Sequence, residues 1–123
     1  MNGTDDLLVP YDGGPVKVFR KTRGEIVATD EIVAFWKTKN DCEVKQDKID
    51  LPNTADDGTS VSVTKYTNCK EQGALVLYTV NGGGHTWPGG KQYLGERWIG
   101  KTNRDIVACD VIWDFFKTLP RNK

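Results

Sequence analysis

The amino-acid sequence predicts a small α/β fold, with two main helices packed on a small sheet. Two stretches near the middle of the chain predict strands: TSVSVTKY at 59–66 alternates apolar and polar residues, and ALVLYTV at 74–80 is apolar almost throughout. Apolar residues recur at helical spacing on both sides of these strands, at 29–40 and from 102 to 119. A chain of 123 residues has room for one domain with a modest core.

Residues 1–28 are rich in Gly, Pro and Asp and show no sustained period. We expect a loop there, with at most a short extended piece at 7–9. Thr29 predicts the start of a helix, because its side chain suits the N-cap and two acidic residues follow in the first turn. Asn40 predicts its end. The face of this helix that we expect to pack in the core carries Ile32, Phe35 and Trp36.

The alternating strand has one apolar and one polar face. We expect Val61 and Val63 to lie on the core. The polar face, which we expect to meet solvent, carries Ser60, Ser62 and Thr64. The apolar strand at 74–80 suits a central position with both faces covered, and a turn around 70–73 would let the two strands pair antiparallel.

Residues 81–101 form a glycine-rich loop with three aromatic residues, Trp87, Tyr93 and Trp98. A second helix is expected to begin near Thr102, with Asp105 three residues later as a capping-box-like acid. The apolar face of this helix would pack on the sheet and carries Ile106, Cys109, Ile112, Trp113 and Phe116.

The charge balance argues against two classes of partner. Lys plus Arg and Asp plus Glu number 17 each, so no net charge attracts nucleic acid or an anionic membrane. No apolar run approaches the length that spans a membrane, and the opening MNGTDDLLVP is not a signal peptide. We therefore expect neither nucleic acid nor a membrane as a partner.

The three cysteines favour a disulfide over a metal site. Cys42 and Cys69 lie in polar, loop-like contexts, whereas Cys109 falls on the helix face that we expect to be buried. No C-x-x-C spacing exists and the single histidine is far away in the sequence, so we expect no metal and no cofactor. A bridge between Cys42 and Cys69 would add about 3 kcal/mol of stability. It would also imply an oxidising compartment, in conflict with the lack of a signal peptide, so the localisation stays open.

The single histidine, His85, lies directly after the apolar strand in the segment NGGGHTWPGG at 81–90. This segment resembles the histidine loop of α/β-hydrolase serine esterases of the poly(3-hydroxybutyrate) depolymerase, feruloyl esterase and acetylxylan esterase type. NGTDDLLVPYDGG at 2–14 is similar to the H-G-T-x-D-x-x-V-P-Y segment that carries the triad acid of these enzymes, with Asn2 in place of the usual His. TNRDIVACDVIWDFF at 102–116 resembles their C-terminal helix, and the contexts of Cys42 and Cys69 match a disulfide that many members carry.

The resemblance covers essentially the whole chain and implies a carboxylic-ester hydrolase. It implies that His85 is the general base, that Asp6 is the triad acid, with the adjacent Asp5 as the alternative, and that Trp87 walls the substrate pocket. The glycines before His85 suit a tight exit from the strand.

The nucleophile that the same resemblance requires, a serine on a Gly-x-Ser-x-Gly elbow, is missing. The two serines, Ser60 and Ser62, lie in the alternating strand without flanking glycines, and Cys109 in mid-helix is no substitute. We therefore expect residues 1–123 to form a single domain that corresponds to the C-terminal part of an α/β hydrolase and lacks the nucleophile-elbow half. Such a domain would be inactive on an ester substrate until a serine-bearing half completed it.

Two other functions stay open. One is a non-catalytic binding or interaction module, and the other is a carbohydrate-binding module that uses Trp87, Tyr93 and Trp98. Two helices and two strands that all carry apolar faces also expose more apolar surface than a chain of 123 residues can bury by itself. We therefore expect a homo-oligomer that covers the exposed sheet edge and apolar surface.

Overall fold

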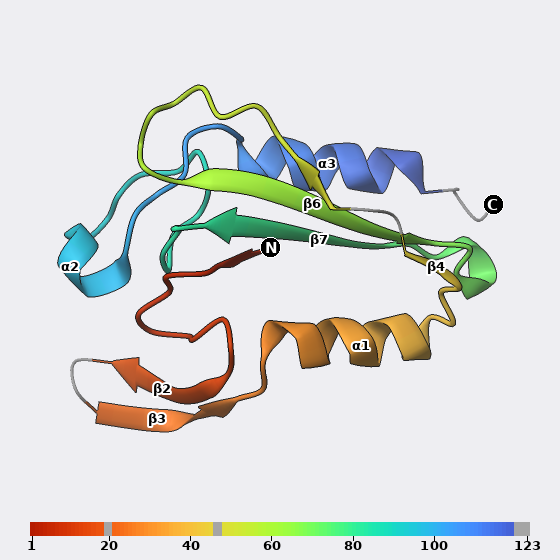
Figure 1. The fold of residues 1–123 in the computed structure, drawn as a ribbon, viewed down its shortest axis with the longest axis horizontal. Helices are drawn as coiled ribbons and strands as arrows, with labels where there is room; N and C mark the ends of the chain where they lie inside the picture. The colour runs from red at the N-terminus through yellow and green to blue at the C-terminus, as the bar shows by residue number, and fades with distance from the viewer. Residues whose placement is uncertain (19–20, 46–47, 120–123) are drawn as a thin grey trace.

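The computed structural model describes residues 1–18, 21–45 and 48–119 and shows a small mixed α/β fold. Its main sheet has the strand order β1-β7-β6-β4, with β5 also paired to β6, and a separate hairpin joins β2 to β3. Figure 1 shows the α3 helix on one side of β6 and β7 and the α1 helix on the other. This arrangement confirms the α/β class.

The centre of the sheet is the antiparallel pair of β6 (Ser60–Thr67) and β7 (Leu75–Asn81), which are joined through a short 3-10 helix, η1 (Lys70–Gln72). Their register runs from Ser60 opposite Asn81 to Tyr66 opposite Leu75. β4 (Val44–Lys45) and β5 (Ile49–Asp50) pair antiparallel with the far side of β6. Both predicted strands and their antiparallel pairing are therefore confirmed.

Both faces of β6 are buried, which corrects the expectation of a solvent-facing polar side. Ser62 is 1% exposed and Thr64 is 9% exposed. Ser62 lies opposite Thr79, whose hydroxyl is 3.1 Å from the hydroxyl of Tyr11, so the N-terminal segment reaches this face. Alternation in a sequence predicts which residues share a face but does not predict what another segment will cover.

The first 28 residues contain more regular structure than the predicted loop. β1 (Asn2–Gly3) runs parallel to β7, with Asn2 opposite Thr79 and Gly3 opposite Val80. β2 (Gly14–Val18) and β3 (Lys21–Ile26) form an antiparallel hairpin with a register shift between Pro15 and Lys17. The expected extended piece at 7–9 is instead a bend.

The first helix, α1 (Thr29–Lys39), lies where the sequence predicts it, although Ala28 rather than Thr29 holds the N-cap position. Phe35 and Trp36 are exposed, so the expectation that they pack in the core is wrong. Their rings instead contact each other edge to face, with centroids 5.4 Å apart.

The C-terminal helix, α3 (Ala108–Thr118), begins six residues later than expected, after a one-turn helix, α2 (Glu96–Ile99). Asp105 does not cap it, because its carboxylate accepts the backbone N–H groups of Thr54 and Ala55. The sheet side of α3 carries Val111 and Phe115, which face Val76 and Tyr78 of β7 across a groove. Of the expected inward positions, Ile112 also lines this groove and is 36% exposed, whereas Cys109, Trp113 and Phe116 lie outside it and are exposed.

A disulfide joins Cys42 to Cys69, as predicted. It links the segment after α1 to the turn between β6 and β7, where the Lys70 N–H also donates to the Asn40 carbonyl at 2.8 Å. Cys109 is the free thiol of the described residues and is exposed, not buried. Within the described ranges, no helix is long and apolar enough to cross a membrane.

Candidate functional site

The candidate site lies beyond the carboxyl ends of two parallel strands. Asp6 follows β1, and His85 follows β7. Because β1 and β7 run in the same direction and lie side by side, the segments that leave them meet at one edge of the sheet. The carboxyl edge of parallel strands is where open α/β sheets place their ligand sites.

Asp6 is held by its own turn. One carboxylate oxygen, Oδ1, accepts the N–H groups of Leu8 at 2.9 Å and Val9 at 2.7 Å. The other oxygen, Oδ2, is 2.8 Å from Nδ1 of His85. The side chain is 12% exposed, so it faces the histidine from a mostly enclosed position. Asp5, the alternative acid, is exposed and accepts a hydrogen bond from Thr4 at 3.1 Å.

His85 has one ring nitrogen bound and one available. Nδ1 faces Asp6, and in the part of the chain that the structure describes Nε2 has no hydrogen-bond partner. The side chain is 43% exposed. An ionised Asp6 favours the tautomer with the proton on Nδ1, which leaves the Nε2 lone pair free to accept a proton.

The glycines before His85 permit close backbone contacts. A Cβ on Gly84 would overlap the Ile99 carbonyl oxygen and Cα of Gly100, and a Cβ on Gly3 would overlap the Gly83 carbonyl. Gly82 has a φ of +71°, a conformation that favours glycine. The glycine run therefore lets the chain leave β7 between two other backbone segments, as expected of a tight strand exit.

Two further hydrogen bonds fix this exit. The N–H of Asp5 donates to the Gly83 carbonyl at 2.9 Å, and the N–H of Gly82 donates to the Thr4 hydroxyl at 2.8 Å. They join the segment after β1 directly to the segment after β7. The separation of Asp6 and His85 is thus set by these contacts as well as by the hydrogen bond between the two side chains.

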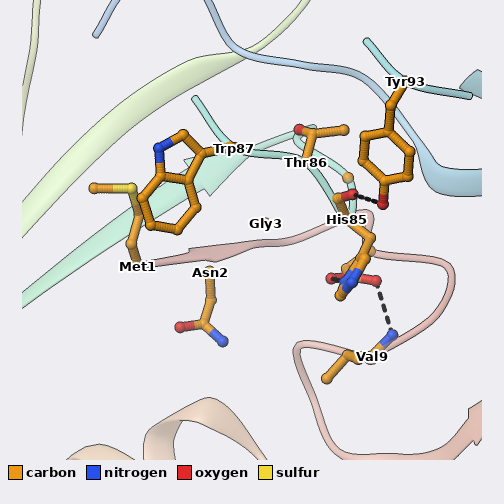
Figure 2. A pocket seen from close by; sticks show the side chains of 10 residues that line it. Met1, Asn2, Gly3, Val9, His85, Thr86, Trp87 and Tyr93 are labelled. Atoms are coloured by element: carbon orange, nitrogen blue, oxygen red, sulfur yellow. Dashed lines mark hydrogen bonds and ion pairs between the residues drawn. The ribbon is translucent and has the colours of Figure 1, made fainter. Parts of the chain in front are cut away.

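A hollow of about 380 Å³ opens beside the His85 ring. Figure 2 shows Trp87 and Tyr93 among its walls, with Thr86 between them and Val9 below His85. Trp87 is exposed and its indole N–H lies 3.4 Å from the Cys109 sulfur. Trp98, the third loop aromatic, does not line this hollow, and the Arg97 guanidinium lies 5.2 Å from its ring centroid.

Neither serine of the chain is arranged as a nucleophile for His85. The Ser62 hydroxyl is buried and has no hydrogen-bond partner among the described residues, and the Ser60 hydroxyl accepts the Asn81 side-chain amide at 3.3 Å. Both belong to β6, on the opposite side of β7 from β1. No group of three or more His, Cys, Asp or Glu side chains in the described ranges is placed to hold a metal ion.

The role of Tyr93 at His85 could not be read from the sequence. Its hydroxyl donates to the His85 backbone carbonyl at 2.9 Å across eight residues of irregular loop. The only sequence signal was an aromatic residue in a glycine-rich segment, which does not specify a hydrogen-bond partner.

The chain is 30% identical over 120 residues to a protein named "Putative esterase NocK" from Nocardia uniformis subsp. tsuyamanensis. The match covers 92% of this chain and 35% of that protein, so the chain spans about a third of the length of its relative. The similarity supports an esterase-like relationship only loosely. No protein-family profile and no solved structure matches the chain significantly.

Proposed function

We propose that these 123 residues supply the acid and the base of a carboxylic-ester hydrolase of the α/β-hydrolase type. The observation that carries the proposal is the contact between Asp6 Oδ2 and His85 Nδ1 at 2.8 Å, at the carboxyl edge of two parallel strands. The order of acid before histidine along the chain agrees with that fold. The similarity to a protein named as an esterase adds independent support.

In the proposed reaction, a serine outside these 123 residues supplies the nucleophile. Nε2 of His85 accepts the proton as the serine oxygen attacks the ester carbonyl, and then returns that proton to the departing alcohol. A water molecule, deprotonated by Nε2 in the same way, then attacks the acyl carbonyl, and His85 returns that proton to the serine oxygen as the acid departs. Asp6 keeps the imidazole proton on Nδ1 and stabilises the imidazolium as it forms.

Trp87 is proposed as a wall of the acyl site. Its ring lines the same hollow as His85 and is exposed, so an acyl group bound there would cover apolar surface. The non-catalytic and carbohydrate-binding alternatives have no comparable observation in their favour.

A chimera tests the proposal. The part of the Nocardia relative that aligns with this chain would be replaced by residues 1–123, and hydrolysis of p-nitrophenyl acetate would be measured beside the unmodified relative. We expect hydrolysis by the chimera, with a loss of at least about 10³-fold on His85→Ala.

The matched controls separate the triad from the fold. Lys117→Ala changes an exposed residue of α3 and should leave the rate unchanged. A chimera that folds but is inactive while the relative is active would argue against the proposal, as would an active chimera that keeps its rate in His85→Ala.

We also propose that the chain, when alone, self-associates. β7 pairs with β6 from Leu75 to Asn81, but with β1 only at Thr79 and Val80, so the other edge of β7 at 75–78 has no strand neighbour in the described part of the chain. Exposed Trp113 and Phe116 add apolar surface on α3. Light scattering should show a mass that rises with concentration, and a monodisperse monomer at high concentration would contradict this proposal.

A further inference from the structure

His85 is held at three points by three different segments. Its N–H donates to the Ile99 carbonyl at 2.5 Å, its carbonyl accepts the Tyr93 hydroxyl at 2.9 Å, and its ring is bound by Asp6. The first two contacts fix the peptide groups on either side of the histidine Cα. The direction in which the imidazole leaves the backbone depends on both.

We propose that Tyr93 is a positioning residue for His85. The Tyr93 hydroxyl holds the His85 backbone so that the imidazole stays aligned with Asp6. The proposal rests on the proposed function, in which the alignment of His85 with Asp6 sets the tautomer. Figure 2 shows the Tyr93 hydroxyl directed at the His85 backbone, with the ring at the wall of the hollow.

The Tyr93 contact is the most adjustable of the three. The Ile99 carbonyl belongs to a residue that is 1% exposed, and Asp6 is fixed by the N–H groups of its own turn. Tyr93 is 54% exposed and lies in a segment without helix or strand. Removing its hydroxyl therefore frees one side of His85 without disturbing the core.

Gln92 holds the Tyr93 loop in place. Its side-chain amide donates to the carbonyls of Leu94 at 2.7 Å and Gly100 at 3.0 Å, and its oxygen accepts the Thr102 hydroxyl. Thr102 is buried, so the loop is tied to an anchored part of the chain. A tyrosine next to such an anchor can direct its hydroxyl at one carbonyl with little loss of conformational freedom.

The single histidine makes the test direct, because every imidazole signal in a nitrogen-15 NMR spectrum belongs to His85. The experiment measures the tautomer ratio and the rate at which the Nδ1 proton exchanges with water, in the wild type and in Tyr93→Phe. Loss of one hydrogen bond should speed this exchange about two- to tenfold and raise the share of the Nε2–H tautomer. Tyr78→Phe is the matched control, since it removes a tyrosine hydroxyl from β7 beneath α3, outside the site.

An exchange rate and tautomer ratio in Tyr93→Phe equal to those of Tyr78→Phe would overturn the proposal. If circular dichroism shows that Tyr93→Phe does not fold, the same exchange measurement is made on Gln92→Ala. That variant releases the Tyr93 loop but keeps the Tyr93 hydroxyl. Faster exchange there supports the proposal, and unchanged exchange overturns it. No step of this test requires ester hydrolysis, so its failure is distinguishable from failure of the esterase proposal.

Discussion

Replacing Asp6 by asparagine is expected to reverse the tautomer of His85 while most of the chain's stability is kept. The asparagine oxygen can still accept the N–H groups of Leu8 and Val9, which now bind Oδ1. Its NH₂ group then occupies the place of Oδ2, 2.8 Å from His85 Nδ1. Two donors cannot face each other at this distance, so Nδ1 must become the acceptor and the proton moves to Nε2.

The contacts set the size of the effect. Asp6→Asn keeps three hydrogen bonds but makes them neutral instead of charge-assisted, which should lower the free energy of unfolding by about 1 kcal/mol. Asp6→Ala removes all three bonds of the carboxylate and should lower it by about 3 kcal/mol. In the chimera, the asparagine variant should lose about 10⁴-fold in rate, as serine proteases do when their triad acid is so changed.

Nitrogen-15 NMR of the single histidine reports the tautomer, and chemical denaturation gives the stability difference. The reasoning is refuted if Asp6→Asn keeps the proton on Nδ1 in the same proportion as the wild type. It is also refuted if Asp6→Asn and Asp6→Ala destabilise the chain equally. The hydrogen bonds from the Leu8 and Val9 N–H groups would then contribute nothing to stability.

Three further perturbations test the fold around the site. Replacing Cys42 and Cys69 by serine should lower the free energy of unfolding by about 3 to 4 kcal/mol, since the bridge closes a loop with a sequence separation of 27; equal denaturation midpoints with and without the bridge would contradict this. Gly84→Ala should cost about 3 kcal/mol because its Cβ would overlap backbone, whereas Gly95→Ala, whose Cβ meets only an ordinary contact, should cost less than about 0.5 kcal/mol in the same urea titration. Burial acts to raise the pKa of Asp105, but hydrogen bonds from two backbone N–H groups and a side-chain amide outweigh it and lower the pKa below the ordinary value of about 3.9. The stability that this carboxylate contributes is therefore present above about pH 4 and is lost as the pH falls further. The difference in unfolding free energy between the wild type and Asp105→Asn should then shrink from pH 6 to pH 3. A difference that stays constant would contradict the assignment.

Periodicity in the sequence was sufficient for the elements with long, regular patterns. The helix at 29–39 and the two central strands follow from the spacing of their apolar residues. The hairpin of β2 and β3 escaped detection because its alternation is only three residues long, at 16–18, and because Gly14, Pro15 and Gly24 are more typical of turns.

The delayed start of α3 also lay outside the reach of periodicity. The N–H of Arg104 donates to Asp57, and the buried Asn103 amide donates to Thr59 and Asp105. Asp57 and Thr59 come from a loop 47 and 44 residues earlier in the chain, whereas Asp105 belongs to the same segment. They anchor residues 103 and 104 to that loop in a non-helical conformation, and residues 102–107 stay extended or bent.

The sequence by itself singled out Asp6, His85 and the Cys42–Cys69 pair, because local motifs can be recognised from their residue types without knowledge of the fold. Only the tertiary structure decided that Asp6 and His85 lie within hydrogen-bond distance, since this depends on β1 pairing parallel to β7 in one particular register. It also decided that Ser62 is buried and that Cys109 and Trp113 are exposed. A local pattern determines which side chains share a face, whereas the segments that cover this face come from elsewhere in the chain.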